Sequence, residues 1–441
     1  MIRYDVAVVG GGPAGLAAAA AAIRGDARVV VVDAASRLGG QYWRHRAGTE
    51  PAELWRMRSS ADHLPDAPVW FAEPAEPAEP AEPAEPAEPA EPGFRLHTPA
   101  GTVAADRVVL ATGAHDRSLP FPGWTLPGVV TVGAAQALLK AHGVLVGRRV
   151  AVAGAGPFLL AVAAGLAAAG ADVVGVFEAG RLRGYARHVT ALRPAKLAEG
   201  ARYAAVLARH RVPYRRGHTV VAAHGGAAVE AITVATGRGE RRIEVDALAI
   251  SYGFTPQVEL AIALGCDTRL DLDGSLVVAV DDAQLTSVAG VYAAGEITGV
   301  GGADLAQLEG TIAGRAVTGQ PPDPGTRRRK AAARRFARAM HDVHRRPSWI
   351  DQLADDTLVC RCEEVPYADV RQAVELGGTD TRAVKLLCRT GMGWCQGRIC
   401  GPAVAELTAR LNSRAPTSAD LAAFAKRPIA QPTTLGDLAG Q

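Results

Sequence analysis

Two long stretches without a charged residue stand out in the pattern of hydrophobic and polar positions, at 6–23 and 150–171. Each begins with a short apolar run, is interrupted early by glycines and a proline, and continues as an alanine-rich segment. An uncharged stretch of this length can cross a membrane. Glycine and proline so near its start instead favour a buried strand, a tight turn and a packed helix. We therefore predict no transmembrane segment.

The same succession of elements is predicted twice along the chain. A strand at 5–9 and a helix at 14–23 lead to a strand at 28–32, and a strand at 150–153 leads through a helix to a strand at 172–177. Each succession is a βαβ unit.

Two such units predict an α/β fold with two Rossmann-like dinucleotide-binding domains, the second inserted in the first. Segments 103–113 and 245–253 are then the crossing points between the domains, and 285–318 is the return to the first.

Seven copies of Ala-Glu-Pro occupy residues 72–92. Proline at every third position prevents both helix and sheet hydrogen bonding, so we predict an extended spacer of about 3.1 Å per residue. The apolar segments 69–71 and 94–96 flank it and place it in a surface hairpin loop. We expect this insertion to be tolerated by the fold rather than required for function.

Charge and cysteine placement narrow the range of functions that this chain can have. The 441 residues carry a net charge of +3. A basic helix is predicted at 327–344. Nucleic-acid binders place basic residues beside aromatic ones on a recognisable module, and the absence of such a module argues against nucleic-acid binding. The basic residues form a solvated face or, alternatively, a site for an acidic partner. Five of the six cysteines lie at 360–400, which indicates metal or redox chemistry in a reducing compartment, and we expect a cytoplasmic protein.

The first glycine turn has the spacing of a dinucleotide site. Gly10 permits the tight turn, Gly12 lets the backbone approach a pyrophosphate, and Gly15 lets helix and strand pack closely. Pro13 and Ala14 open the helix, whose N-terminal N–H groups attract phosphate. Asp33 ends the next strand, where a carboxylate can bind ribose hydroxyls.

The second turn departs from this pattern. Gly154 and Gly156 match the first two glycines, but Leu159 takes the place of the third. Glu178 ends the next strand and favours NAD(H), because a carboxylate repels a 2′-phosphate. NAD(H) binding, another adenine nucleotide and a retained scaffold all remain open.

Four cysteines form two close pairs, Cys360-x-Cys362 and Cys395-x4-Cys400. Four thiolates suit an iron–sulfur cluster or Zn²⁺, and the C-x-C spacing with glycines around the second pair favours [2Fe–2S]. Cys388 is expected to be a spectator, although it could substitute as a ligand. Cys266 is expected to be a small buried hydrophobe.

Further motifs resemble those of flavoproteins with two dinucleotide-binding domains. These are the segments 108–114, 286–296 and 38–43. The resemblance implies FAD at the first site, with contacts from Ala111, Thr112, Gly113, Gly295, Glu296, Gly40 and Gln41. No cysteine pair follows Gly40, so thiol–disulfide turnover is not expected.

Taken together, the motifs resemble the FAD/NAD-binding alpha-type subunits of multi-subunit dehydrogenases of amino and imino acids, the family that includes subunits of opine oxidase, D-hydroxyproline dehydrogenase and hydrogen cyanide synthase. The segment with four cysteines is similar to the bacterioferritin-associated ferredoxin-like [2Fe–2S] domain. The resemblance implies two partners: a flavoprotein subunit that oxidises the amino acid, and a small ferredoxin-like subunit.

This resemblance divides the chain into parts. The FAD-binding domain is expected at 1–148 and 247–320, the NAD-binding-like domain at 149–246, a basic helical linker at 321–355, the [2Fe–2S] domain at 356–414 and a tail at 415–441.

We expect an FAD-dependent oxidoreductase subunit that passes electrons between FAD and a [2Fe–2S] cluster. One alternative is a stand-alone NAD(P)H-dependent reductase, and another is a non-catalytic redox-sensing scaffold. His115 and Arg117 follow the segment 108–114, but no residue is assigned as a catalytic base.

Overall fold

The structure, a computed structural model, describes residues 3–57, 60–75, 93–180 and 182–439. Nearly all of the Ala-Glu-Pro repeat lies outside the described residues, and its extended form stays a prediction. The first copy, residues 72–74, lies in β4 (Phe71–Pro74), which pairs antiparallel with β5 (Phe94–Thr98) beyond the last copy. The repeat is therefore inserted in a hairpin, as expected. Its first copy is part of a strand, contrary to the prediction that proline excludes the repeat from a sheet.

The first sheet has the strand order β3-β2-β1-β6-β5-β4, and β19 also pairs with β6. Its parallel part brings the end of β1 beside the ends of β2 and β6, because Val9 lies opposite both Val32 and Leu110. The bounds of these strands are β1 (Arg3–Val9), β2 (Val29–Val32), β3 (Asp62–Leu64), β6 (Gly101–Leu110) and β19 (Val291–Ala293).

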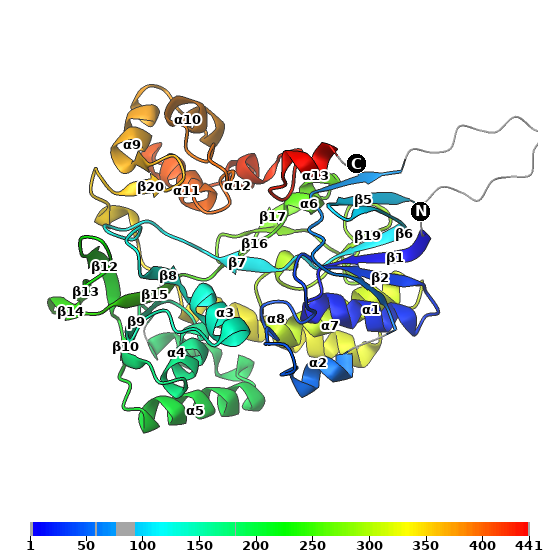
Figure 1. Cartoon of the computed structure of the whole chain (residues 1–441), viewed down its shortest axis with the longest axis horizontal. Helices are drawn as coiled ribbons and strands as arrows, with labels where there is room; N and C mark the ends of the chain where they lie inside the picture. Colours follow the sequence, from blue (N-terminus) through cyan, green and yellow to red (C-terminus); the bar gives the residue numbers. More distant parts are fainter. Residues whose placement is uncertain (1–2, 58–59, 76–92, 181, 440–441) are drawn as a thin grey trace, which may run out of the picture.

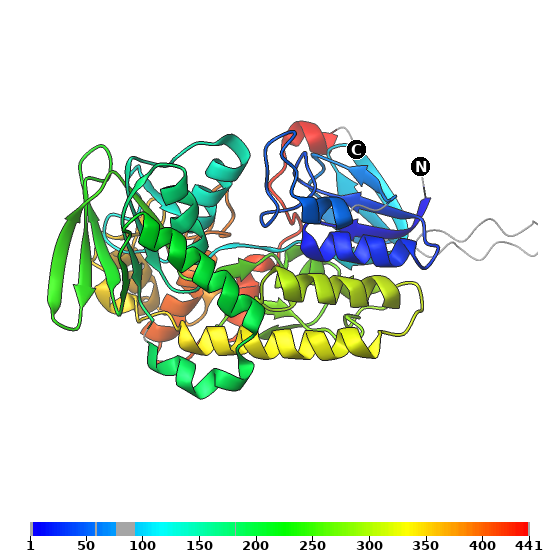
Figure 2. The same cartoon turned by 90° about the horizontal axis from the view of Figure 1, so that it is seen from below.

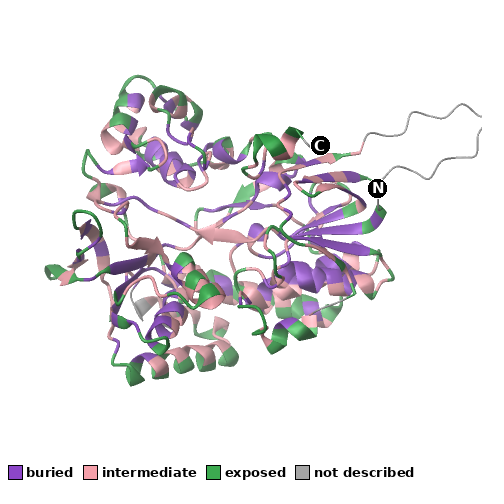
Figure 3. Ribbon diagram, in the orientation of Figure 1, coloured by how far each residue is buried: buried purple, intermediate pink, exposed green. Residues whose placement is uncertain are grey.

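Helices α1 (Pro13–Ile23) and α7 (Ala303–Ala316) cover one face of this sheet and lie against each other (Figure 2). Two glycines of α7 make this approach possible. A β-carbon on Gly310 or Gly314 would overlap a backbone carbonyl of α1. Figure 3 shows the central strands and α1 as the most continuously buried part of the molecule.

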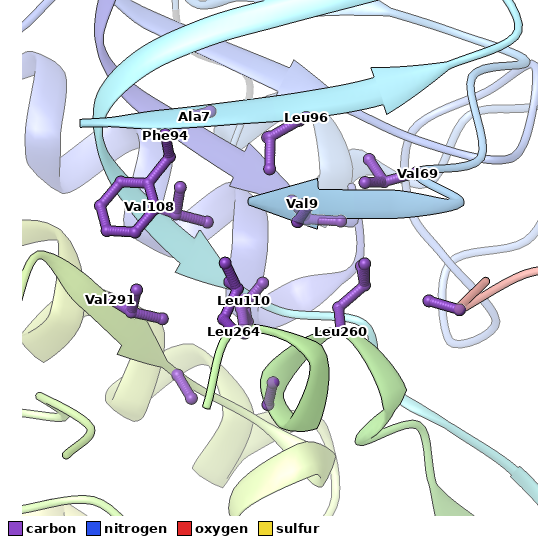
Figure 4. Packing of buried hydrophobic residues seen from close by; sticks show 14 of the residues in the cluster. Ala7, Val9, Val69, Phe94, Leu96, Val108, Leu110, Leu260, Leu264 and Val291 are labelled. Atoms are coloured by element: carbon purple, nitrogen blue, oxygen red, sulfur yellow. The ribbon is translucent and has the colours of Figure 1, made fainter. Parts of the chain in front are cut away.

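The other face of the sheet carries the main hydrophobic core (Figure 4). Val9 and Leu110, from the two central strands, meet Leu260 and Leu264, which lie in and just after α6 (Glu259–Ala263). These side chains are almost fully removed from water. Burial of a leucine contributes about 1.5–3 kcal/mol, so this packing fixes the strand ends that form the site.

The second sheet is wholly parallel in the order β11-β10-β9-β15-β8. Its strands are β8 (Val129–Thr131), β9 (Arg149–Gly154), β10 (Asp172–Glu178), β11 (Tyr214–Arg216) and β15 (Ala247–Ser251), and its helices are α3 (Val132–His142), α4 (Phe158–Ala168) and α5 (Pro194–Arg209). An antiparallel sheet of β12 (Thr219–His224), β13 (Ala231–Thr236) and β14 (Gly239–Glu244) lies beside it.

Two short strands join the sheets. The chain leaves the first sheet through β7 (Ala114–Asp116) and returns through β16 (Phe254–Pro256), and the two pair antiparallel between the sheets (Figure 1). This path confirms the predicted α/β class with the second nucleotide-binding unit inserted in the first. The remaining short elements of this part are α2 (Ala52–Met57), β17 (Thr268–Leu270) and β18 (Leu276–Val278).

The basic helix α8 (Pro324–Val343) follows α7 and begins where Asp323 accepts a hydrogen bond from Thr326 N. It runs along the molecule from the first sheet towards the second, as the long yellow helix of Figure 2. Ala333 and Ala337 on its buried face pack against Leu305 of α7. The predicted bounds, 327–344, agree closely with those observed.

The last part contains the cysteines and is mainly helical, as predicted. Its elements are β20 (Leu358–Cys360), β21 (Val365–Pro366), α9 (Tyr367–Glu375), α10 (Thr381–Cys388) and α11 (Gly401–Leu411). The tail shows little periodicity, yet it forms α12 (Ser418–Ala425) and α13 (Leu435–Ala439). A capping box between Thr417 and Asp420 starts α12, which explains a helix too short for a periodic signal.

Among the described residues, no helix combines the length and the apolar character needed to cross a membrane. The two uncharged stretches form β1 with α1 and β9 with α4, as the glycine turns predict.

Candidate functional site

A cavity of about 1980 Å³ is lined by residues of both nucleotide-binding units. All but three of the predicted cofactor-binding residues line it: Gly10, Gly12, Pro13, Ala14, Asp33, Gly40, Gln41, Ala111, Thr112, Gly113, Gly156, Gly295 and Glu296. Gly15, Gly154 and Glu178 do not. The cavity therefore brings together segments from six separate parts of the chain.

The first glycine turn is held tightly against the sheet. Gly10 has φ +106, and a β-carbon on it would overlap the carbonyl of Ala111. A β-carbon on Gly15 would overlap the carbonyl of Gly10, so Gly15 serves helix–strand packing and lies behind the cavity wall. Helix α1 begins after Gly12 without a side-chain cap, which leaves its first N–H groups available to a phosphate.

Asp33 lies at the end of β2 and is 8% exposed. Its Oδ2 accepts a hydrogen bond from Gly11 N, and its Oδ1 accepts one of 2.7 Å from Ala35 N. These bonds fix the carboxylate at the cavity wall, within reach of a ligand bound along the glycine turn.

Two carboxylates, one partly exposed and one buried, support the opposite wall. Glu296 accepts hydrogen bonds from Gly302 N (2.8 Å) and Gly301 N (3.2 Å), and burial raises the pKa of its carboxyl. Glu309, which sequence analysis missed, accepts from Gly295 N at 3.1 Å and forms a 2.5 Å ion pair with Arg334 of α8. An acid among the small and apolar residues in the middle of α7 was the available signal.

The second glycine turn holds its acid in a similar way. Glu178 Oε2 accepts a hydrogen bond from Gly156 N (3.2 Å), and Oε1 accepts one from Gly180 N (3.0 Å). Glu178 is only 1% exposed. Gly154 has φ +130 and lies directly against the carbonyl of Ser251, so it shapes the turn from behind.

The end of α8 covers this acid. His344 Nδ1 lies 3.4 Å from Glu178 Oε1, while His344 Nε2 and the Tyr185 hydroxyl are 2.8 Å apart. Gly180 packs against Val343, since a β-carbon on it would lie 3.1 Å from the Val343 carbonyl oxygen. Leu159 is fully buried in the core of the second sheet. The carboxylate expected to contact a ribose is therefore enclosed by protein.

The four predicted ligand cysteines contact one another across the two motifs. Cys360 hydrogen bonds with Cys400, and Cys362 with Cys395. Gly391 N donates to Cys360 Sγ at 3.5 Å, and these bonds lower the pKa of Cys360 to about 6. Within the described part of the chain no three Cys, His, Asp or Glu side chains converge on one metal-ion position. Four thiols in two pairs are the type of donor set that a cluster with two irons takes in other proteins.

The other two cysteines have separate roles. Cys388 Sγ donates to the Val384 carbonyl of its own helix at 3.1 Å. Cys266 is buried 3.4 Å from the Thr286 hydroxyl, and burial raises the pKa of its thiol. Neither belongs to the thiol pairs.

His115 on β7 lies between the large cavity and the cysteines. His115 lines the large cavity, and its Nε2 donates a 3.1 Å hydrogen bond to the carbonyl of Arg398, in the loop between Cys395 and Cys400. A carbonyl can only accept, so Nε2 carries the proton. Burial lowers the pKa of His115, which keeps the ring neutral at neutral pH. Nearby Arg117 is buried and pairs with Asp273 at 3.0 Å, and it also donates to the carbonyl of Phe254 on β16.

Comparison with known proteins identifies the fold of this site. The model of the pyridine nucleotide-disulphide oxidoreductase family matches residues 4–313. The chain belongs to this family. A BFD-like [2Fe-2S] binding domain model matches residues 358–410 and includes the four predicted ligand cysteines. The predicted enzyme class, an oxidoreductase of this fold, is confirmed.

Several relatives extend over almost the whole chain. The A subunit of opine oxidase from Agrobacterium tumefaciens is 34% identical over 99% of this chain and 91% of the relative. Hydrogen cyanide synthase subunit HcnB of Pseudomonas aeruginosa is 33% identical over 89% and 90%. The structure of L-proline dehydrogenase from P. horikoshii matches with a TM-score of 0.69 at 21% identity, over 99% of this chain and 79% of that one. The predicted resemblance to alpha-type subunits is confirmed.

Proposed function

We propose that this chain is the electron-transferring subunit of a multi-subunit dehydrogenase of amino or imino acids, with FAD in the large cavity and a [2Fe–2S] cluster on Cys360, Cys362, Cys395 and Cys400. A partner subunit oxidises the substrate, of the opine, hydroxyproline or glycine type. Flavin accepts electrons in pairs and releases them singly, which matches a one-electron cluster.

The large cavity supports the FAD assignment. Its 1980 Å³ exceeds the roughly 300–1,000 Å³ of pockets for drug-sized ligands, as an extended dinucleotide requires. The uncapped start of α1 offers N–H groups to the pyrophosphate, and Asp33 offers a carboxylate to the ribose. Gly295 and Glu296 line the wall opposite, where the ribityl chain would lie.

The cysteine site supports the cluster assignment by its chemistry. Four thiols lie in two contacting pairs, and Gly391 N already points to a sulfur. Backbone N–H groups directed at cluster sulfurs favour the more negative, reduced state.

One observation carries the proposal: His115 borders the large cavity and also bonds the loop between Cys395 and Cys400. The side chain of His115, on β7, therefore links the wall of the flavin cavity to the cysteine loop. Electron transfer between two centres depends on such proximity, whereas a redox-sensing scaffold would not require it.

The enclosure of Glu178 argues against a stand-alone NADH-dependent reductase. The carboxylate is 1% exposed and is covered by His344. A nicotinamide dinucleotide would have to displace this cover before it could reach the acid.

The names of the relatives support an assembly of several subunits, because the opine oxidase and hydrogen cyanide synthase relatives are both named as subunits. We propose two partners for this chain: a flavoprotein subunit that oxidises the amino acid, and a small ferredoxin-like subunit.

The test is an anaerobic visible spectrum of the purified chain before and after NADH. We expect flavin and cluster bands that NADH leaves oxidised, and bleaching by an amino or imino acid only once the oxidising partner is added. Bleaching of both bands by NADH alone would favour the stand-alone reductase.

A matched pair of cysteine variants tests the cluster ligands. Cys395→Ser is expected to lose the cluster bands and electron flow to an acceptor while flavin remains. Cys388→Ser is expected to retain both, because the hydrogen bonds described for this thiol join it to Val384 and Thr390 and not to the four predicted ligands. A full cluster in Cys395→Ser contradicts the assignment.

A further inference from the structure

The tail beyond residue 410, outside the segment matched by the iron–sulfur domain model, packs onto the cysteine site. The ring of Phe424 on α12 lies against three glycines of the cysteine segment. A β-carbon on Gly391, Gly397 or Gly401 would come within 3.0 Å of Phe424. These glycines therefore leave space for the tail, in addition to freeing backbone N–H groups.

Arg427, just after α12, is bonded to the loop between Cys395 and Cys400. Its Nη1 donates to the Gln396 carbonyl, and its Nη2 lies 3.1 Å from Glu259 Oε1 on α6. Arg398, inside the loop, donates to the carbonyls of Cys395 (3.2 Å) and Ala430. Glu259, on the first nucleotide-binding part, thus pairs with two arginines that hydrogen bond to the cysteine loop.

The tail is fastened at its other end as well. Ala430 N donates to the Trp70 carbonyl at 2.6 Å, and Gln431 bonds Gln257 at 3.3 Å. Figure 1 shows this red segment running from the cysteine part to the first sheet. The tail therefore joins the cysteine loop to the flavin-binding part.

The three charges are poorly exposed to solvent. The side chains of Arg398, Arg427 and Glu259 are 13%, 12% and 8% exposed. Arg398 Nε lies 3.8 Å from Glu259 Oε1. Two positive charges face one negative charge, so a net positive charge remains beside the thiols.

We propose that Arg427 and Arg398, anchored by Glu259, are positioning residues that hold the loop between Cys395 and Cys400 and raise the reduction potential of the cluster. This inference rests on the proposed function, because it requires a cluster on these cysteines. Reduction adds one negative charge to the cluster, and a nearby positive charge favours that state. Charges that are largely buried are screened little by salt, so the effect persists at physiological ionic strength.

The experiment is a redox titration of the full-length holoprotein with chemical mediators, followed by the electron paramagnetic resonance signal of the reduced cluster. Arg427→Gln is expected to lower the midpoint potential, so that the ratio of reduced to oxidised cluster at the wild-type midpoint falls about tenfold, or about 59 mV for one electron. Glu259→Gln removes the negative charge and is expected to raise the midpoint.

Arg371→Gln is the matched control. It also removes one positive charge from the cysteine part, but Arg371 is 42% exposed and pairs with Asp355 on the surface. Its midpoint should equal that of the wild type. Iron content is measured for each variant. If Arg427→Gln assembles no cluster, the inference is tested by Glu259→Gln alone: a raised midpoint potential supports it, and a lowered or unchanged one overturns it.

Opposite shifts in Arg427→Gln and Glu259→Gln support the inference. Unchanged midpoints in cluster-containing variants, or equal shifts in the Arg371→Gln control, overturn it. The titration uses mediators in place of the substrate, so it can fail while the proposed function still holds. A wild-type chain that contains no cluster would instead contradict the proposed function itself.

Discussion

In both βαβ units, a carboxylate at the end of the second strand accepts a hydrogen bond from a backbone N–H of the glycine turn, 22 residues earlier in the chain. The surroundings of the two acids differ. Asp33 faces the large cavity, whereas Glu178 is enclosed beneath His344 and does not line it. The third glycine differs as well: Gly15 brings α1 against Gly10, while Leu159 fills the core of the second sheet.

The comparison shows that one local geometry can serve two purposes. A glycine turn and an acid create a nucleotide site only where the adjacent space is left open. At the second unit, the end of α8 occupies the position near the acid. Four sets of substitutions would break or sharpen this contrast.

The largest effect is expected for Gly10→Ala. Its β-carbon would overlap the Ala111 carbonyl at φ +106, so the turn must move and flavin content should fall more than tenfold. Gly156→Ala is the control, because φ there is +116 but nothing lies within 4 Å. We expect it to retain flavin. The ratio of flavin to protein absorbance after purification measures both, and equal losses would contradict the contrast.

Leu159→Ala is expected to destabilise the second unit without creating a nucleotide site. The side chain is fully buried, and truncation of a buried leucine costs about 2–5 kcal/mol. Denaturant unfolding measures the loss of unfolding free energy. An increase in NADH binding by this variant would instead mean that Leu159 alone had closed the site.

Asp33→Asn should weaken flavin binding, while Glu178→Gln should leave it unchanged. The Asp33 carboxylate faces the cavity, and a hydrogen bond to a charged group contributes about 1.5–3 kcal/mol. We therefore expect at least a tenfold rise in the dissociation constant for FAD, measured by reconstitution of the apoprotein. Equal weakening by both substitutions would show that the two acids act alike.

The smallest effect is expected for His344→Ala. Removal of the imidazole exposes Glu178, and NADH binding should rise by a few-fold over the wild type. Quenching of tryptophan fluorescence during NADH titration measures it. His341→Ala is the control, since His341 Nε2 bonds the Val300 carbonyl at 2.8 Å on the side of the first nucleotide-binding part. Unchanged NADH binding in His344→Ala would show that a residue other than His344 keeps NADH from the second site.

Much of the fold could be predicted because its signals are local. The uncharged stretches with early glycines correctly predict β1 with α1 and β9 with α4. The helix α12 could not be predicted in this way, because it is short and is started by a capping box between Thr417 and Asp420 rather than by a long periodic pattern. Glu309 was missed for another reason: its partners, Gly295 and Arg334, come from different elements.

By itself, the sequence determined the two glycine turns, their acids and the four cysteines, since each depends on residue type at short spacing. Tertiary structure alone decided which acid faces a cavity, because the cover over Glu178 comes from His344, far along the chain. It also decided that Phe424 and Arg427 belong to the cysteine site. Such contacts join distant segments through packing and buried charge, and no local pattern encodes them.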